Sequence, residues 1–145
     1  NTIRIIIEER QAWGTWEQGG TTYTIDRDGY VLGTIPPAAG SPAIRSETAG
    51  VLTQGDRVDY QAVEAAAQIY DRLPRQLGTQ VREVAYLESK GVQVTTIDGQ
   101  TALFGDSSSI AYKLSVWAAL QHEAQAQGIE YTFVDLRYGN RPVVQ

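Results

Sequence analysis

The chain of 145 residues contains no cysteine and no methionine. Without cysteine it forms no disulfide, carries no thiol nucleophile and offers no thiolate to a metal ion. Proteins outside and inside the cytoplasm can both do without cysteine, so the compartment stays open. Because even position 1 is not methionine, we expect a fragment or a processed form, with any signal or membrane anchor lying upstream.

Positive charge and long apolar runs are also scarce. The 12 Lys and Arg stand against 17 Asp and Glu, which gives a net charge of −5 at pH 7. Binding to phosphates needs a basic surface, so we expect no nucleic-acid partner. No apolar run approaches the roughly 20 residues that span a bilayer. The length is sufficient for one domain with a substantial core.

A single histidine, His122, limits the available chemistry. A metal site on its helix would need ligands four residues away, where the chain has Ala118 and Ala126. The tripeptide Gly105-Asp106-Ser107 is typical of a serine-protease nucleophile, but its only candidate base is His122, on the helix that these serines are expected to cap. We therefore predict a surface histidine, a helix cap, no catalytic residue, no metal and no cofactor.

Three other motifs have both a structural and a functional interpretation. The segment Asp26-Arg-Asp-Gly29 resembles half of a calcium loop, but the rest of the loop would fall among prolines, so we predict a β-turn. Trp13 and Trp16 belong either to the core or to an exposed binding surface, and we favour the core. Glu8 and Glu9 would face opposite ways on a strand and make no carboxylate pair.

Hydrophobic periodicity predicts two helices. Asp59 is a good N-cap for a helix over 59–73, which Pro74 is expected to limit. The serines of 107–109 offer N-caps for a second helix over 110–127, with Gly128 at its C′ position. Its buried residues are expected to form one stripe: Ile110, Leu114, Trp117 and Leu120.

Strands are predicted between and around these helices, over 2–8, 22–25, 30–32, 81–87, 92–97 and 101–104. Residues 34–42 hold three prolines and are expected to be irregular. The helices interrupt hairpins instead of alternating regularly with strands. This order favours an α+β fold, a mostly antiparallel β-sheet with two main helices.

The C-terminal residues 130–145 are the most informative part of the chain. Alternate residues of a predicted strand share one face: Thr132, Val134, Leu136 and Tyr138. Asp135 and Arg137 fall on the other face, and Gly139-Asn140 suits a two-residue hairpin turn. Because Pro142 has no N–H to donate, Val143 and Val144 are expected on an edge strand at the C-terminus. Such an edge is either covered or a docking site for another chain.

Several short motifs follow one another along the chain. They are Ile3-Arg-Ile-Ile-Ile-Glu-Glu-Arg10 with Ala12-Trp13, Tyr23-Thr-Ile-Asp-Arg-Asp-Gly-Tyr-Val-Leu32, Val81-Arg-Glu-Val84, Asp98-Gly99, Leu103-Phe-Gly105, Lys113-Leu114 and Val134-Asp-Leu-Arg-Tyr138. In this order they resemble the FtsQ/DivIB family of bacterial cell-division proteins over nearly the whole chain. The last motif is the most specific part of the resemblance.

The resemblance implies a domain organisation, a location and partners. Residues 1–10 would be the last strand of a preceding POTRA domain or a lead-in strand, and residues 11–145 an FtsQ-type β domain. A single upstream membrane anchor would hold the protein at the extracytoplasmic face of the bacterial inner membrane. It would be a non-enzymatic scaffold of the divisome that binds proteins of the FtsB/DivIC and FtsL type.

The resemblance also implies a binding site, since in the family the C-terminal edge of the sheet accepts a partner strand. The matching residues are Arg137 and Tyr138, followed by the edge residues Pro142, Val143 and Val144. An acidic residue of the partner is expected to reach Arg137, and Tyr138 to anchor the interface.

Two functions of other classes stay open at this point. A small extracytoplasmic hydrolase would need a cleft with converging ionisable groups. A carbohydrate-binding module would need exposed, coplanar aromatic side chains, so the positions of Trp13, Trp16 and Trp117 decide that alternative.

Overall fold

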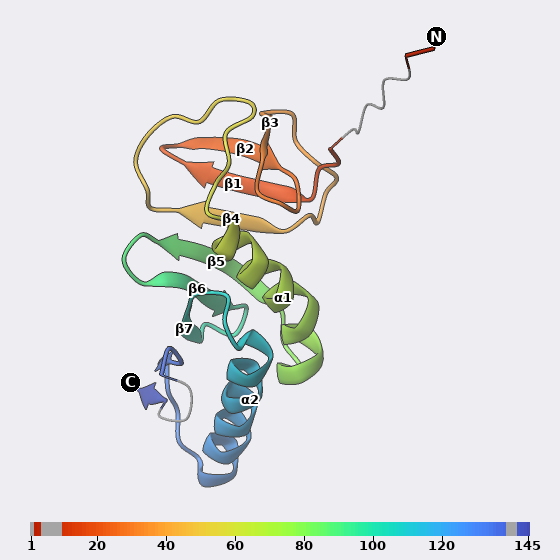
Figure 1. Cartoon of the computed structure of the whole chain (residues 1–145). Coiled ribbons are helices and arrows are strands. Elements are labelled where there is room, and N and C mark those ends of the chain that lie inside the picture. Colours follow the sequence, from red (N-terminus) through yellow and green to blue (C-terminus); the bar gives the residue numbers. More distant parts are fainter. Residues whose placement is uncertain (1, 4–9, 139–141) are drawn as a thin grey trace.

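The computed structural model describes residues 2–3, 10–138 and 142–145 (Figure 1). Along this part of the chain the elements are β1 (Gly14–Gln18), β2 (Thr21–Ile25), β3 (Val31–Gly33), β4 (Ala43–Ser46), α1 (Tyr60–Leu77), β5 (Val81–Leu87), β6 (Gly91–Thr96), β7 (Thr101–Gly105), α2 (Ile110–Gln127), β8 (Phe133–Asp135) and β9 (Val143–Val144). The strand expected over 2–8 and the turn at Gly139-Asn140 lie largely or wholly outside the described residues.

All described strands belong to one sheet with the order β3-β2-β1-β4-β5-β6-β7-β8-β9. Three neighbouring pairs are parallel: β1 with β4, β4 with β5, and β7 with β8. The other pairs are antiparallel. The predicted α+β fold, with a mostly antiparallel sheet, two main helices and a C-terminal edge strand, is confirmed.

The two helices are the crossovers of two parallel strand pairs. The helix α1 connects β4 to β5, and α2 connects β7 to β8. Both connections step across the sheet in the same direction, toward β9. Because such crossovers share one hand, both helices pack on the same face, and Figure 1 shows them side by side on that face. Within the part of the chain that the structure describes, no helix covers the opposite face of the sheet.

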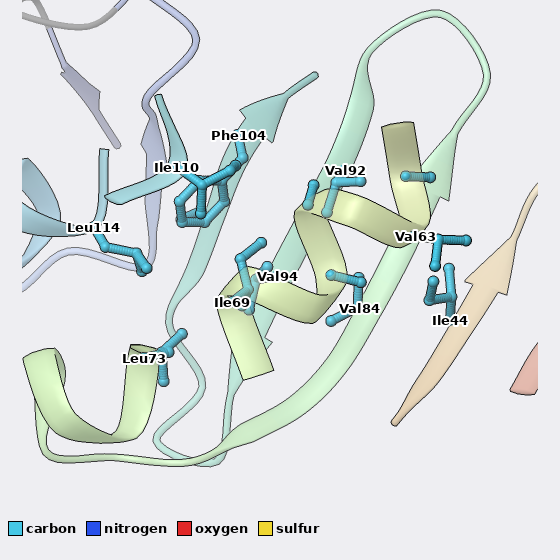
Figure 2. Close-up of a cluster of buried hydrophobic side chains, with 14 of the residues drawn as sticks. Ile44, Val63, Ile69, Leu73, Val84, Val92, Val94, Phe104, Ile110 and Leu114 are labelled. Carbon is cyan, nitrogen blue, oxygen red and sulfur yellow. The ribbon is translucent and has the colours of Figure 1, made fainter. Parts of the chain in front are cut away.

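The core lies between the helices and this face of the sheet (Figure 2). Along β6, Val92 and Val94 are buried while the intervening Gln93 is only half-buried, as the period of a strand requires. Helix α1 meets them with Val63 and Ile69, which are also buried. Amphipathic strands and helices therefore cover each other in two layers.

Helix α1 runs past Pro74 to Leu77, so the prediction that Pro74 limits it was wrong. A proline in the last turn removes one N–H donor, and the helix can continue for the few residues that remain. Gly78 then ends it in a left-handed conformation with φ 68°, and its N–H donates to the Pro74 carbonyl over 3.1 Å. The predicted N-cap is confirmed: Asp59 accepts the N–H groups of Gln61 and Ala62.

Strands β1 and β4 were not predicted. In β1 the three buried positions are Gly14, Trp16 and Gln18, which do not give an apolar alternation. Gln18 is nevertheless satisfied inside: it accepts the Trp16 indole N–H at 3.0 Å and donates to the Gly50 carbonyl at 3.2 Å. Long-range pairing, and not local pattern, makes this segment a strand.

Helix α2 has the predicted bounds and a serine at its N-cap, as predicted, but that serine does not cap the helix with its side chain. Ser109 is the N-cap, with φ 57° and no side-chain capping bond. The turn is held instead by Asp106, whose carboxylate accepts the Ser108 N–H over 2.9 Å. Ile110, Leu114 and Trp117 are buried as expected, whereas Leu120 is only half-buried.

Candidate functional site: the C-terminal edge of the sheet

The last two strands form an antiparallel pair at one end of the sheet. Val134 lies opposite Val144, and Asp135 lies opposite Val143. Gln145 exchanges two main-chain hydrogen bonds with Phe133, at 2.9 and 3.1 Å. The expected edge strand is therefore present, although β8 is shorter than the predicted 132–138 because a turn begins after Leu136.

Strand β9 presents main-chain groups to the outside of the sheet. In an antiparallel pair, residues that exchange hydrogen bonds alternate with residues whose N–H and C=O point away. Because Gln145 is bonded to Phe133, Val144 turns both of its groups away from β8. Pro142 faces the same way but carries only a carbonyl. The described part of this edge thus offers one donor and two acceptors.

The opposite edge of the sheet, β3, is covered by the chain itself. The Val31 N–H donates to the Asp56 carbonyl over 2.8 Å, and the Val31 carbonyl accepts the Gly55 N–H over 2.9 Å. The Val58 N–H donates to the Gly29 carbonyl over 2.9 Å. These bonds occupy the groups that another strand would use. Among the described residues, no such segment covers β9.

The side chains at the C-terminal edge are apolar and exposed. Tyr138 is 65% exposed, Val143 53% and Val144 40%, whereas Val134 and Leu136 are fully buried. The prediction that Tyr138 continues the strand face of Val134 and Leu136 was wrong, because the turn begins before the strand alternation reaches it. Tyr138 is therefore available at the surface.

Arg137 lies next to this edge and is already paired within the chain. Its Nη2 donates to Asp135 Oδ2 over 2.8 Å, and its Nε lies 3.1 and 3.2 Å from the two carboxylate oxygens. This hydrogen bonding lowers the pKa of the Asp135 carboxyl below its ordinary value. The guanidinium also lies 5.3 Å from the Tyr138 ring centre. The sequence analysis singled out Arg137 as a site residue but did not predict that Asp135 pairs with it.

A buried lysine supports the same end of the sheet and was not singled out as a site residue. The Lys113 ammonium donates to the Phe104 carbonyl over 2.7 Å and lies 3.9 Å from Asp106 Oδ1. Burial lowers its pKa, and the nearby Asp106 opposes that shift. The position of Lys113 beside the apolar stripe of α2 was the sequence signal that could have indicated a buried lysine. Lys113 ties α2 to the end of β7, directly before Gly105.

Other hollows do not assemble a reactive group. One of about 290 Å³ is lined by Asp59, Tyr86, Glu88 and Asp106, among others. Asp59 is engaged as the cap of α1 and accepts the Tyr86 hydroxyl over 2.7 Å. Asp106 holds the turn before α2. These carboxylates therefore have structural roles, and within the described residues no cluster of His, Asp or Glu suits a metal ion.

The remaining candidate residues follow the structural interpretation. His122 is exposed on α2. Trp16 and Trp117 are buried, and Trp13 is half-buried against the core. The aromatic surface that a carbohydrate-binding module needs is thus not formed by the tryptophans. Asp26 accepts the N–H groups of Asp28 and Tyr30, which makes 26–29 the expected β-turn.

Comparison with known proteins identifies the fold's relatives. The family model described as "Cell division protein FtsQ/DivIB, C-terminal" matches residues 14–137. The chain belongs to the FtsQ/DivIB family. A protein named "Cell division protein FtsQ" from Chloroflexus aurantiacus is 34% identical over 136 residues, covering 92% of this chain and 48% of the relative.

Other members of the family agree. The FtsQ of Chloroflexus aggregans is 31% identical over the same share of both chains. The FtsQ of Mycobacteroides abscessus is 29% identical over 120 residues, 83% of this chain and 36% of its own length. The chain thus spans about half the length, or less, of the curated relatives it matches.

Membership of the FtsQ/DivIB family assigns the chain to the proteins of cell division and septation. The resemblance drawn from the ordered motifs is confirmed. Neither helix of the described residues is long and apolar enough to cross a membrane.

Proposed function

We propose that this domain is a non-enzymatic scaffold of the divisome, which binds membrane-anchored division proteins of the FtsB/DivIC and FtsL type. Binding occurs in part by addition of a partner strand to β9. The partner-binding residues are Arg137, Tyr138, Pro142, Val143 and Val144. A membrane anchor upstream of residue 1 holds the domain at the extracytoplasmic face of the inner membrane, and the boundary of this domain at residues 10 and 11 stays a prediction.

The single observation that carries the proposal is the contrast between the two edges of the sheet. The main-chain groups of β3 are bonded to the segment 55–58, whereas Val144 directs its N–H and C=O outward. Natural proteins cover or charge an edge that must not pair. An apolar edge with groups free to pair is the arrangement that strand addition uses.

Side chains beside the edge supply specificity. Tyr138 offers a large exposed ring with a polar tip, a type of residue common at interface hot spots. Arg137 has five N–H donors in a planar fork, and its contacts with Asp135 use the edge formed by Nε and Nη2. The other edge of the guanidinium suits a carboxylate of the partner.

The test is calorimetric binding of the soluble fragment of the FtsB/DivIC-type protein from the same genome. Arg137→Glu removes a charge-assisted hydrogen bond worth roughly 1.5–3 kcal/mol, so its affinity should fall about tenfold or more. Tyr138→Ala should also weaken binding. Val143→Pro should act indirectly, because the Val143 N–H belongs to the pair with β8 and its loss dislodges β9.

Val144→Pro gives the sharper result, since it removes the outward N–H and leaves the bonds between β9 and β8 in place. Its matched control is Val51→Ala, a change at an exposed valine in the loop before α1. The proposal holds if Val144→Pro folds normally and binds weakly while the control binds like the parent. Unchanged binding by Arg137→Glu, Tyr138→Ala and Val144→Pro alike refutes it.

A further inference from the structure

Arg137 is bonded to Asp135 of β8 and lies against Gly105 of β7. Asp135 accepts its side-chain fork at 2.8–3.2 Å and also accepts the Arg137 main-chain N–H at 3.0 Å. The side chain of Asp135 is 13% exposed and that of Arg137 31%. A pair so shielded from water is stronger than an ion pair on the open surface. Asp135 therefore restricts Arg137 to one direction.

The aliphatic stem of Arg137 packs against Gly105. A Cβ at position 105 would lie 3.2 Å from Arg137 Cγ, and the glycine has φ +82°, which disfavours any side chain. The main chain of β6 packs closely against Gly105, because a Cβ on Gly91 would come within 2.2 Å of the Gly105 carbonyl oxygen. The stem of Arg137 thus lies against the main chain at the end of β7.

The register places this assembly beside the open edge. Asp135 lies between Leu103 of β7 and Val143 of β9. Its neighbours Val134 and Leu136 point into the core, so Asp135 points to the face of the sheet without helices. Val144 is paired with Val134 and faces the helix-covered side.

We propose that Asp135 and Gly105 are positioning residues that aim Arg137 at a carboxylate of the added strand. This inference rests on the proposed function. It also fixes where that carboxylate stands. The partner residue opposite Val144 shares the face of Val144, so a side chain that reaches Arg137 comes from a position an odd number of residues away.

Asp135 could instead compete with the partner for Arg137. The geometry argues against competition, because one carboxylate occupies the Nε and Nη2 edge and leaves Nη1 pointing elsewhere. Two carboxylates can share a guanidinium from its two edges. Removal of Asp135 would leave the charge of Arg137 unpaired, but the guanidinium would no longer be held in one orientation.

The experiment compares three single variants, Asp135→Asn, Gly105→Ala and Arg137→Gln. It also includes the double variant that combines Asp135→Asn with Arg137→Gln. The control is Asp71→Asn, which breaks the exposed pair with Arg75 on α1. Binding of the same FtsB/DivIC-type fragment is measured by calorimetry, and the Arg137 Nε–H signal is followed by NMR in the free domain.

We expect Asp135→Asn to bind about tenfold more weakly, since a charge-assisted bond loses its alignment. It should broaden the Nε–H signal of Arg137 and cause no further loss in the Arg137→Gln background. Changing a carboxylate of the partner strand to an amide should weaken binding only where that residue lies an odd number of positions from the partner residue opposite Val144. Asp71→Asn should bind like the parent.

Two results overturn the inference. The first is binding by Asp135→Asn that equals that of the parent, which would show that Asp135 has no role, or exceeds it, which would show competition. Equal losses from Asp135→Asn with and without Arg137 would show that Asp135 acts only on the fold. Failure of strand addition itself is distinct: Val144→Pro would then bind normally, whatever Asp135→Asn does.

Discussion

At the scale of single residues, Trp117 shows how one side chain joins helix and sheet. Its ring is fully buried and meets Phe104 edge-on, with 6.0 Å between ring centres. The indole N–H donates to the Tyr131 hydroxyl over 3.0 Å, and that hydroxyl donates in turn to Gln121. The apolar body and the polar tip of Trp117 are both satisfied, as a buried indole requires.

Truncation of this side chain should be severe. We expect Trp117→Ala to lower the free energy of unfolding by roughly 3–5 kcal/mol, because it leaves a large cavity and an orphaned hydroxyl. Urea melts provide the measurement. Trp13→Ala, at a half-buried tryptophan, is the control and should cost less. A loss below about 1 kcal/mol for Trp117→Ala would contradict its place in the core.

At the scale of elements, the start of α1 is joined to β5 by a hydrogen bond between side chains. Asp59 caps the helix through Oδ1 and accepts the Tyr86 hydroxyl at Oδ2 over 2.7 Å. This bond to Asp59, together with burial, raises the pKa of Tyr86 to about 12. An unfolded tyrosine ionises near pH 10. The folded state thus keeps the proton to a higher pH than the unfolded state.

The sign of the resulting pH dependence follows from linkage. The contribution of Tyr86 to stability is complete below about pH 10 and is lost as the pH rises toward about 12. Urea melts between these pH values should show a steeper decline for the parent than for Tyr86→Phe, which cannot ionise. Tyr112→Phe, at an exposed tyrosine, is the control. Identical slopes for the parent and Tyr86→Phe would show that the bond to Asp59 is not formed.

At the scale of the whole molecule, the described residues form a sheet with one closed and one open end. The segment 55–58 closes β3, and two helices cover one face along β4 to β8. The strand β9 contributes two residues and is held by β8. Protection of main-chain groups should therefore fall toward β9.

Amide hydrogen exchange followed by NMR tests this gradient. In the free domain we expect the Val144 N–H, which points outward, to exchange faster than the Gln145 N–H, which is bonded to the Phe133 carbonyl over 2.9 Å. Addition of the FtsB/DivIC-type fragment should slow Val144 most. The Val94 N–H, in the middle of the sheet, is the internal reference. Slow exchange at Val144 before any partner is added would show that the edge is already covered.

The local sequence was sufficient for much of the fold. The helix over 110–127 and the strand over 81–87 have their predicted bounds, and Asp59 caps α1. Periodicity, caps and hairpin turns depend on residues within a few positions of one another. The same is true of the ordered motifs, which were enough to indicate the family that the comparisons confirm.

Other features were decided by tertiary structure alone. β1 became a strand because β2 and β4 pair with it on both sides, although its own pattern is weak. The closure of one sheet edge depends on bonds between Val31 and residues more than twenty positions away. Tyr138 is exposed because a turn interrupts the alternation that would have buried it. The sequence by itself determined both helices, most of the strands and the family, because these depend on local patterns. Which edge stays open, and how Arg137 is held beside it, depended on contacts between distant segments that no local pattern encodes.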